Sequence, residues 1–110
     1  MGIYRNPAHY KIKMTAKARQ DLRETYLYIK KELKEPGAAQ RFYTDTLDSI
    51  ASLDKMPERH AYVCDEQLAE KGYRMMPVKN HTVFYTADNK NKIVMIARIL
   101  YSRRDWKNIL

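Results

Sequence analysis

With 110 residues, 45% of them hydrophobic, the chain is the size of one domain with a single core. Its 21 Lys and Arg against 13 Asp and Glu give a formal net charge of +8, which favours an acidic or polyanionic partner. No apolar run approaches the roughly 20 residues that cross a bilayer, so the sequence predicts a soluble, cytoplasmic protein that binds no membrane.

The N-terminal part of the sequence predicts a strand followed by a helix. Residues 1–9 have no apolar signal-peptide centre, and we expect them to be a flexible extension of one domain spanning 1–110. Residues 10–14 alternate apolar and basic, as a half-buried strand does, and Thr15 can cap the helix that follows. One face of that helix should carry an apolar stripe of Ala18, Leu22, Tyr26, Ile29 and Leu33.

A second helix should follow the break at Pro36-Gly37 and pack antiparallel on the first. Its apolar positions run from Ala39 to Leu53, and it should stop at Met56-Pro57. Residues 58–70 form a connector that contains four acidic residues and one cation. The lone Cys64 has no internal partner and is expected to be a half-buried connector residue in a reducing compartment.

The C-terminal part predicts three sequential strands. Residues 73–78 and 82–87 should form a hairpin around a Lys79-Asn80-His81 turn, and residues 88–91 should form a second turn. Residues 93–100 are apolar apart from Arg98 and should form a central strand, with the N-terminal strand beside it. The fold class is therefore α+β: a strand, a two-helix antiparallel hairpin, then a three-stranded antiparallel meander with the helices on one face.

Positive charge is concentrated in the meander. Residues 71–110 hold nine Lys and Arg against two acids. His9, His60 and His81 lack zinc-site spacing, and glycine-rich phosphate loops and serine elbows are missing, so the sequence predicts neither a metal nor a cofactor. The remaining candidate site is cationic, and arginine suits phosphate and carboxylate alike.

Two segments resemble the RelE/ParE superfamily of toxins from type II toxin–antitoxin modules. They are Gly72-Tyr-Arg-Met-Met-Pro-Val-Lys-Asn-His-Thr-Val-Phe-Tyr85 and Ala97-Arg-Ile-Leu-Tyr-Ser-Arg-Arg-Asp-Trp106. The resemblance covers residues 10–110 and implies the α+β fold given above. It also implies a growth inhibitor, of the kind that stabilises plasmids, held by a cognate acidic antitoxin in a hetero-oligomer.

The resemblance is closer to ParE-like members, which inhibit DNA gyrase, than to RelE-like ribosome-dependent mRNA interferases. Arg103 falls at the last-strand arginine of the nucleases, but Thr82 stands where their middle-strand arginine is expected. The chain ends Trp106-Lys-Asn-Ile-Leu110, without their terminal tyrosine. Three alternatives stay open: an mRNA interferase, a degenerate member without toxicity, and a non-toxic basic nucleic-acid-binding module.

Each function assigns its own residues. A nuclease would use Arg103 and Arg74 to stabilise phosphate charge and His81 as the proton carrier, with Tyr101 as the other candidate for that role. A contact surface for the target would include Arg98, Tyr101, Arg103, Arg104 and Trp106. The antitoxin would neutralise Arg74, Lys79, Arg98 and Arg103.

Structural roles compete with several of these assignments. Arg98 suits an internal ion pair, and residues 103–105 suit a solvated strand end tied by local ion pairs. Trp106 suits an aromatic plug on the helices, and His81 suits an exposed turn.

Overall fold

The computed structural model of the protein describes residues 9–110. The strands are β1 (Lys11–Met14), β2 (Arg74–Val78), β3 (His81–Asp88) and β4 (Ile93–Tyr101), and the helices are α1 (Ala16–Leu27), α2 (Pro36–Ala51) and α3 (Glu66–Glu70). A π-helical turn, Tyr28–Glu32, extends α1, and 3-10 turns occupy Ser52–Asp54, Pro57–Arg59 and Trp106–Asn108. Among the described residues, no helix is long and apolar enough to cross a membrane.

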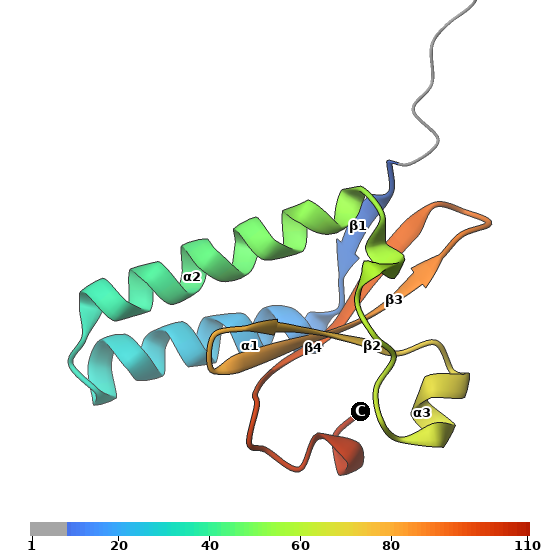
Figure 1. The fold of residues 1–110 in the computed structure, drawn as a ribbon. Coiled ribbons are helices and arrows are strands. Elements are labelled where there is room, and N and C mark those ends of the chain that lie inside the picture. Colours follow the sequence, from blue (N-terminus) through green and yellow to red (C-terminus); the bar gives the residue numbers. More distant parts are fainter. Residues whose placement is uncertain (1–8) are drawn as a thin grey trace, which may run out of the picture.

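The four strands form one sheet in the order β1-β4-β3-β2 (Figure 1). The strands β2, β3 and β4 pair antiparallel, while β1 runs parallel to β4. This arrangement confirms the predicted meander, with β4 in an interior position beside the N-terminal strand. The predicted extension, 1–9, lies outside the described residues except for His9, which makes a bridge to Lys55.

The two long helices cover one face of the sheet, as expected, and the main core lies between these layers (Figure 1). Residues from α1, α2, β3 and β4 meet there, among them Leu22, Ile50, Tyr85 and Ile96. The break at 36–37 differs from the prediction in one respect. Pro36 is the first residue of α2, where its missing N–H and fixed φ are tolerated, so it begins the second helix.

A smaller core covers the opposite face of the sheet. There Val63, Leu68, Phe84 and Leu100 are buried, and Trp106 packs on Phe84 with ring centroids 5.3 Å apart. The predicted plug on the helices is therefore wrong about the face, because the chain folds beneath the sheet after β4. Cys64, in the connector to this core, is exposed rather than half-buried.

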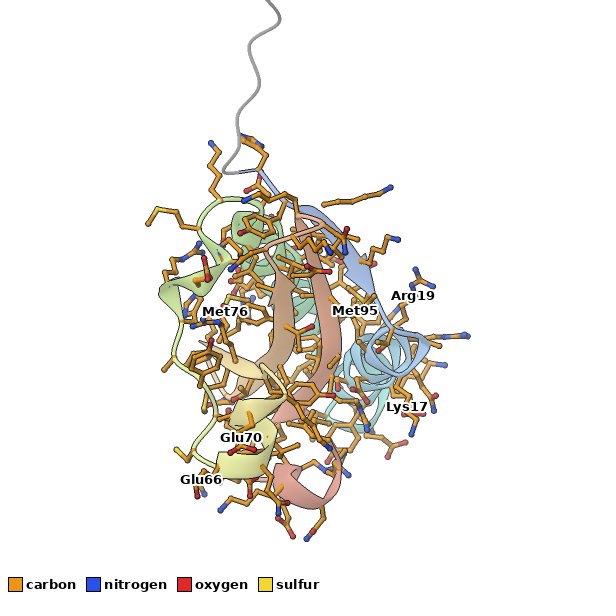
Figure 2. The ribbon with its side chains drawn as sticks, turned by 90° about the vertical axis from the view of Figure 1, so that its right-hand side faces the viewer. Lys17, Arg19, Glu66, Glu70, Met76 and Met95 are labelled. Atoms are coloured by element: carbon orange, nitrogen blue, oxygen red, sulfur yellow. The ribbon has the colours of Figure 1, made fainter. Side chains whose placement is uncertain are left out.

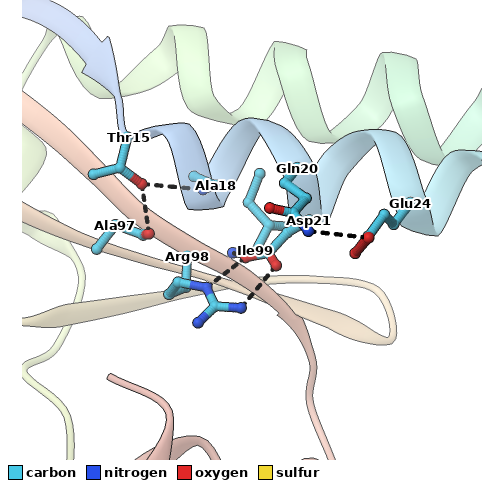
Figure 3. A network of polar contacts seen from close by, with 8 residues as sticks. All are labelled: Thr15, Ala18, Gln20, Asp21, Glu24, Ala97, Arg98 and Ile99. Atoms are coloured by element: carbon cyan, nitrogen blue, oxygen red, sulfur yellow. Dashed lines mark hydrogen bonds and ion pairs between the residues drawn. The ribbon is translucent and has the colours of Figure 1, made fainter.

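The start of α1 completes the edge of β4 beyond the end of β1. The backbone N–H of Thr15 donates to Ile96, and its hydroxyl donates to the Ala97 carbonyl and caps α1 by accepting from the Ala18 N–H (Figure 3). This confirms the predicted cap. A second polar side chain of α1, Asp21, accepts from the Ile99 N–H at 3.0 Å. A strand edge without a neighbouring strand thus has its hydrogen bonds satisfied by a helix.

Candidate functional site

Two adjoining hollows lie between the tip of the helical hairpin and the turn that joins β2 to β3. Their volumes are about 490 Å³ and 210 Å³, and Ile29, Ala38, Asn80 and His81 line both. We call the two together the tip groove. Tyr28, Leu33, Tyr101 and Arg104 line its larger part, so apolar side chains there meet a cation at the end of the sheet.

The hairpin tip exposes apolar side chains because the regular α-helix ends early. The stripe was predicted to continue to Leu33 with α-helical spacing, but α1 gives way to the π-helical turn after Leu27. A wider turn shifts the direction of the side chains that follow it. Leu33 is 52% exposed and Tyr28 is 55% exposed, and both line the tip groove instead of the core.

His81 lies on the floor of the groove, where the prediction of an exposed turn residue is wrong. It is the first residue of β3 and is half-buried, since the turn itself contains only Lys79 and Asn80. Its ring lies between Phe42, at 4.8 Å, and Tyr101, at 5.7 Å between centroids. Burial lowers the pKa of His81 below its usual 6.5, so the imidazole is neutral at pH 7.

Lys79 and Thr46 supply polar groups at the smaller hollow. The Lys79 ammonium pairs with the Asp45 carboxylate at 2.7 Å, and its backbone is left-handed with φ 55°. This ion pair joins α2 to the β2–β3 turn. Thr46 is fully buried, and its hydroxyl has no hydrogen-bond partner within residues 9–110.

Arg98 forms an internal ion pair. Its Nε and Nη2 donate to the two oxygens of Asp21 at 2.7 and 2.9 Å, and the side chains are 17% and 9% exposed (Figure 3). Hydrogen bonding to Asp21 raises the pKa of Arg98. Asp21 was not singled out from the sequence, although its place between Ala18 and Leu22 on the apolar face of a helix is the signal that could have identified it.

Arg74 lies far from the other candidate cations. Its Nη1 donates to the carbonyls of Glu58 at 3.1 Å and His60 at 2.7 Å, and its guanidinium lies 3.9 Å from the centre of the Tyr62 ring. The partner of His81 in the sheet is Val78, four residues along β2 from Arg74. At ~3.4 Å per residue, the backbones of Arg74 and Val78 are about 14 Å apart.

Residues 102–105, which follow β4, are exposed to solvent, and packing on the smaller core begins at Trp106. Arg103 and Arg104 are exposed, and neither forms an ion pair with another described residue, so the predicted local ion pairs of 103–105 are not formed. Tyr101 is 44% exposed beside His81. Of the predicted site residues, Lys79, His81, Tyr101 and Arg104 line the tip groove. Arg74, Arg98 and Trp106 have structural contacts elsewhere, and Arg103 is exposed outside the groove.

Comparison with solved structures identifies the class of fold. The toxin–antitoxin system ParDE of P. aeruginosa has a chain with a TM-score of 0.69 and 21% identity, covering 86% of this chain and 97% of that one. A RelBE2 complex from Mycobacterium tuberculosis has a chain with a TM-score of 0.61 and 18% identity, covering 88% of this chain and 95% of that one. An archaeal RelE-RelB complex from Pyrococcus horikoshii OT3 has a chain with a TM-score of 0.55 and 12% identity, covering 87% of this chain and 98% of that one. This is the RelE/ParE fold.

A family comparison then places the sequence within that class. Residues 12–106 match the family described as the ParE toxin of the type II toxin–antitoxin system parDE. The match spans nearly the whole chain, so this protein belongs to the ParE toxin family. A search of curated proteins finds no match.

Proposed function

We propose that this protein is a toxin that inhibits DNA gyrase by binding it and is held inactive by a cognate acidic antitoxin. Membership of the ParE toxin family supports the toxin assignment. The similar solved structures are toxin–antitoxin complexes, which supports a hetero-oligomer with an antitoxin. Plasmid stabilisation and a cytoplasmic location remain predictions.

The distance between the candidate cations is the observation that favours inhibition by binding over RNA cleavage. A nuclease would need Arg74, His81 and Arg103 around one phosphate, because transition-state charge is stabilised by groups within hydrogen-bond distance. Arg74 instead lies near the far end of β2 and donates to two backbone carbonyls. With Arg74 held away from His81, this three-residue set does not meet at one phosphate, and the toxin acts by occupying its target.

The tip groove is the proposed antitoxin site. An antitoxin segment with apolar and acidic side chains would cover Tyr28 and Leu33 and approach Lys79 and Arg104. Two residues predicted to contact the antitoxin, Arg74 and Arg98, are less suited to it because they already have internal partners. Lys79 and Arg103 remain candidates, although Lys79 also pairs with Asp45.

Arg103 and Arg104 are the candidate contacts to the target, and a supercoiling assay tests them. Purified gyrase should lose supercoiling activity as the toxin concentration rises. Arg103→Glu should raise the toxin concentration needed by at least about tenfold, since a contact charge is reversed at an exposed site where the fold is unaffected. Lys90→Glu, in the β3–β4 turn, is the control with the same change in net charge. Unchanged supercoiling at concentrations that still stop growth would exclude gyrase as the target.

Ribosome-dependent mRNA cleavage is the second candidate, and one observation favours it. His81 is neutral at pH 7 and lies against Tyr101 with Arg104 lining the same groove, so a proton acceptor and a cation are near each other. The wild-type protein should then produce new mRNA ends on translating ribosomes. Loss of these ends with the His81→Gln variant would support this function. A protein inactive in both assays and harmless to cells would be a member without toxicity or a nucleic-acid-binding module.

A further inference from the structure

A second basic surface lies on α1, on the flank opposite the tip groove. Arg19, Arg23 and Lys30 follow one another along this flank, and Arg19 projects away from the sheet (Figure 2). Because successive residues turn by about 100° around an α-helix, Arg19, Arg23 and Tyr26 of α1 fall within one narrow sector. Lys30 belongs to the π-helical turn after α1, and its ammonium reaches the same face over the Tyr26 ring. We call these residues, together with Tyr43 of α2, the α1 basic face.

The α1 basic face contains a hollow of about 300 Å³ lined by Arg19, Arg23, Tyr26 and Tyr43, with Leu22 at its base. The two tyrosine rings pack edge to face with centroids 5.7 Å apart. The Lys30 ammonium lies 5.7 Å from the centre of the Tyr26 ring. Neither tyrosine hydroxyl has a hydrogen-bond partner in the described part of the chain, so both can donate to a ligand.

Acidic side chains near this face are turned elsewhere. Asp21 is bonded to Arg98 and the Ile99 N–H, and Glu24 accepts from Gln20 and lines the tip groove. Within residues 9–110, no ion pair includes Arg19, Arg23 or Lys30. Residues 10–34 hold eight Lys and Arg against three acids, so this surface is a basic region separate from the meander.

We propose that the α1 basic face binds the phosphate backbone of duplex DNA without reading its sequence. From Arg19 to Lys30 the cations extend over ~16 Å of helix rise, a length that corresponds to about five phosphates of one DNA strand when it is measured along the duplex axis. Arginine, lysine and tyrosine hydroxyl groups are the usual donors to phosphate oxygens. This binding goes beyond toxicity and does not depend on which target the toxin inhibits.

Two other occupants fit the face less well. A single strand binds by stacking bases on open aromatic faces, but Tyr26 and Tyr43 pack on each other and Lys30 lies over Tyr26. An acidic peptide needs several apolar anchors between the cations. Leu22 is only 7% exposed and Tyr26 is half-buried, which leaves Tyr43, 38% exposed, as the exposed apolar side chain of this face. The α1 basic face offers cations but no aromatic ring free for base stacking. Such a surface suits the regular array of phosphates on a duplex better than either alternative.

The test is a titration of a labelled duplex of about 25 base pairs with the full chain, followed by fluorescence anisotropy. The affinity is measured at several salt concentrations between about 50 and 200 mM. Each phosphate contact contributes about −0.9 to the slope of log affinity against log salt. The Arg19→Gln/Arg23→Gln variant should therefore flatten the slope by about 1.8, and glutamine keeps helix propensity high. Lys71→Gln/Lys90→Gln has the same loss of charge at exposed sites outside the face and should leave the slope unchanged.

Circular dichroism of both variants shows whether the fold is retained. Equal flattening by the two variants would mean that net charge alone drives binding, and would overturn the proposal. Tighter binding to polyglutamate or to a single-stranded oligonucleotide than to the duplex at matched salt would also overturn it. Because the assay contains neither gyrase nor ribosome, failure here leaves the supercoiling result unaffected, and the reverse also holds.

Discussion

At the scale of single residues, the Asp21–Arg98 pair connects the helical layer to the sheet. One carboxylate neutralises Arg98 and accepts from the Ile99 N–H, so it satisfies three donors at the edge of β4 (Figure 3). Removing one partner of such a pair leaves a charge and a backbone group without partners. The loss is greater than the net stabilisation that the pair supplies.

Asp21→Ala should accordingly lower the free energy of unfolding by about 2–4 kcal/mol, as expected for a mostly buried pair near a sheet edge. Asp21→Asn should cost less, because its amide oxygen still accepts from the Ile99 N–H. Urea denaturation of the two variants measures both values. Equal costs would show that the Ile99 hydrogen bond contributes little.

At the scale of elements, the sequence predicted most of the fold because apolar periodicity records burial. The β1 alternation, the α2 stripe and the apolar run of β4 all follow the observed layers. The prediction failed at the end of the first helix, because the spacing of apolar residues does not show where α-helical geometry ends. A π-helical turn has no clear sequence pattern, so Leu33 was placed in the core and the groove at the tip was missed.

The candidate site was less predictable than the fold, because it depends on contacts between distant residues. Arg74 and Arg103 looked equivalent as strand-end cations, yet the 58–60 connector holds one of them and the other is free of ion pairs among the described residues. The sequence predicts a three-residue turn that includes His81. A two-residue turn moves it into β3, beneath the helical hairpin.

The packing of His81 on α2 predicts a pH dependence of stability. Its pKa is lowered in the folded state, as is that of His60, where burial and then Arg59 are the causes. Below about pH 6.5 the unfolded chain binds more protons than the folded one, so stability is full above that pH and falls as the solution is acidified.

Thermal unfolding between about pH 5.5 and 7.5 should therefore show a melting temperature that falls with acidification. In His81→Gln the fall should be smaller, and the remaining dependence belongs to His60. Identical pH profiles for the variant and the wild-type protein would mean that His81 titrates normally in the folded state.

At the scale of the whole molecule, basic and acidic residues are concentrated in different segments of the chain. Residues 10–34 and 71–110 are strongly basic, while residues 35–70 hold eight acids against three cations. The tip groove lies where α1, α2 and the meander meet, so it combines exposed apolar side chains with cations from the sheet. A partner that covers it gains from burial and charge together, as an amphipathic acidic segment does.

The last prediction concerns this groove and the antitoxin. Tyr28→Ala/Leu33→Ala removes two exposed anchors that line the groove without opening the core, so the toxin should fold normally. Its affinity for the antitoxin should fall by about 2–4 kcal/mol, the usual cost of losing central apolar anchors. Calorimetry with the cognate acidic antitoxin proposed above measures the change. Met56→Ala/Tyr62→Ala is the matched control, because these side chains are 69% and 51% exposed and lie outside the groove. If both double variants bind equally well, the antitoxin covers another surface, and the cations after β4 become the next region to test.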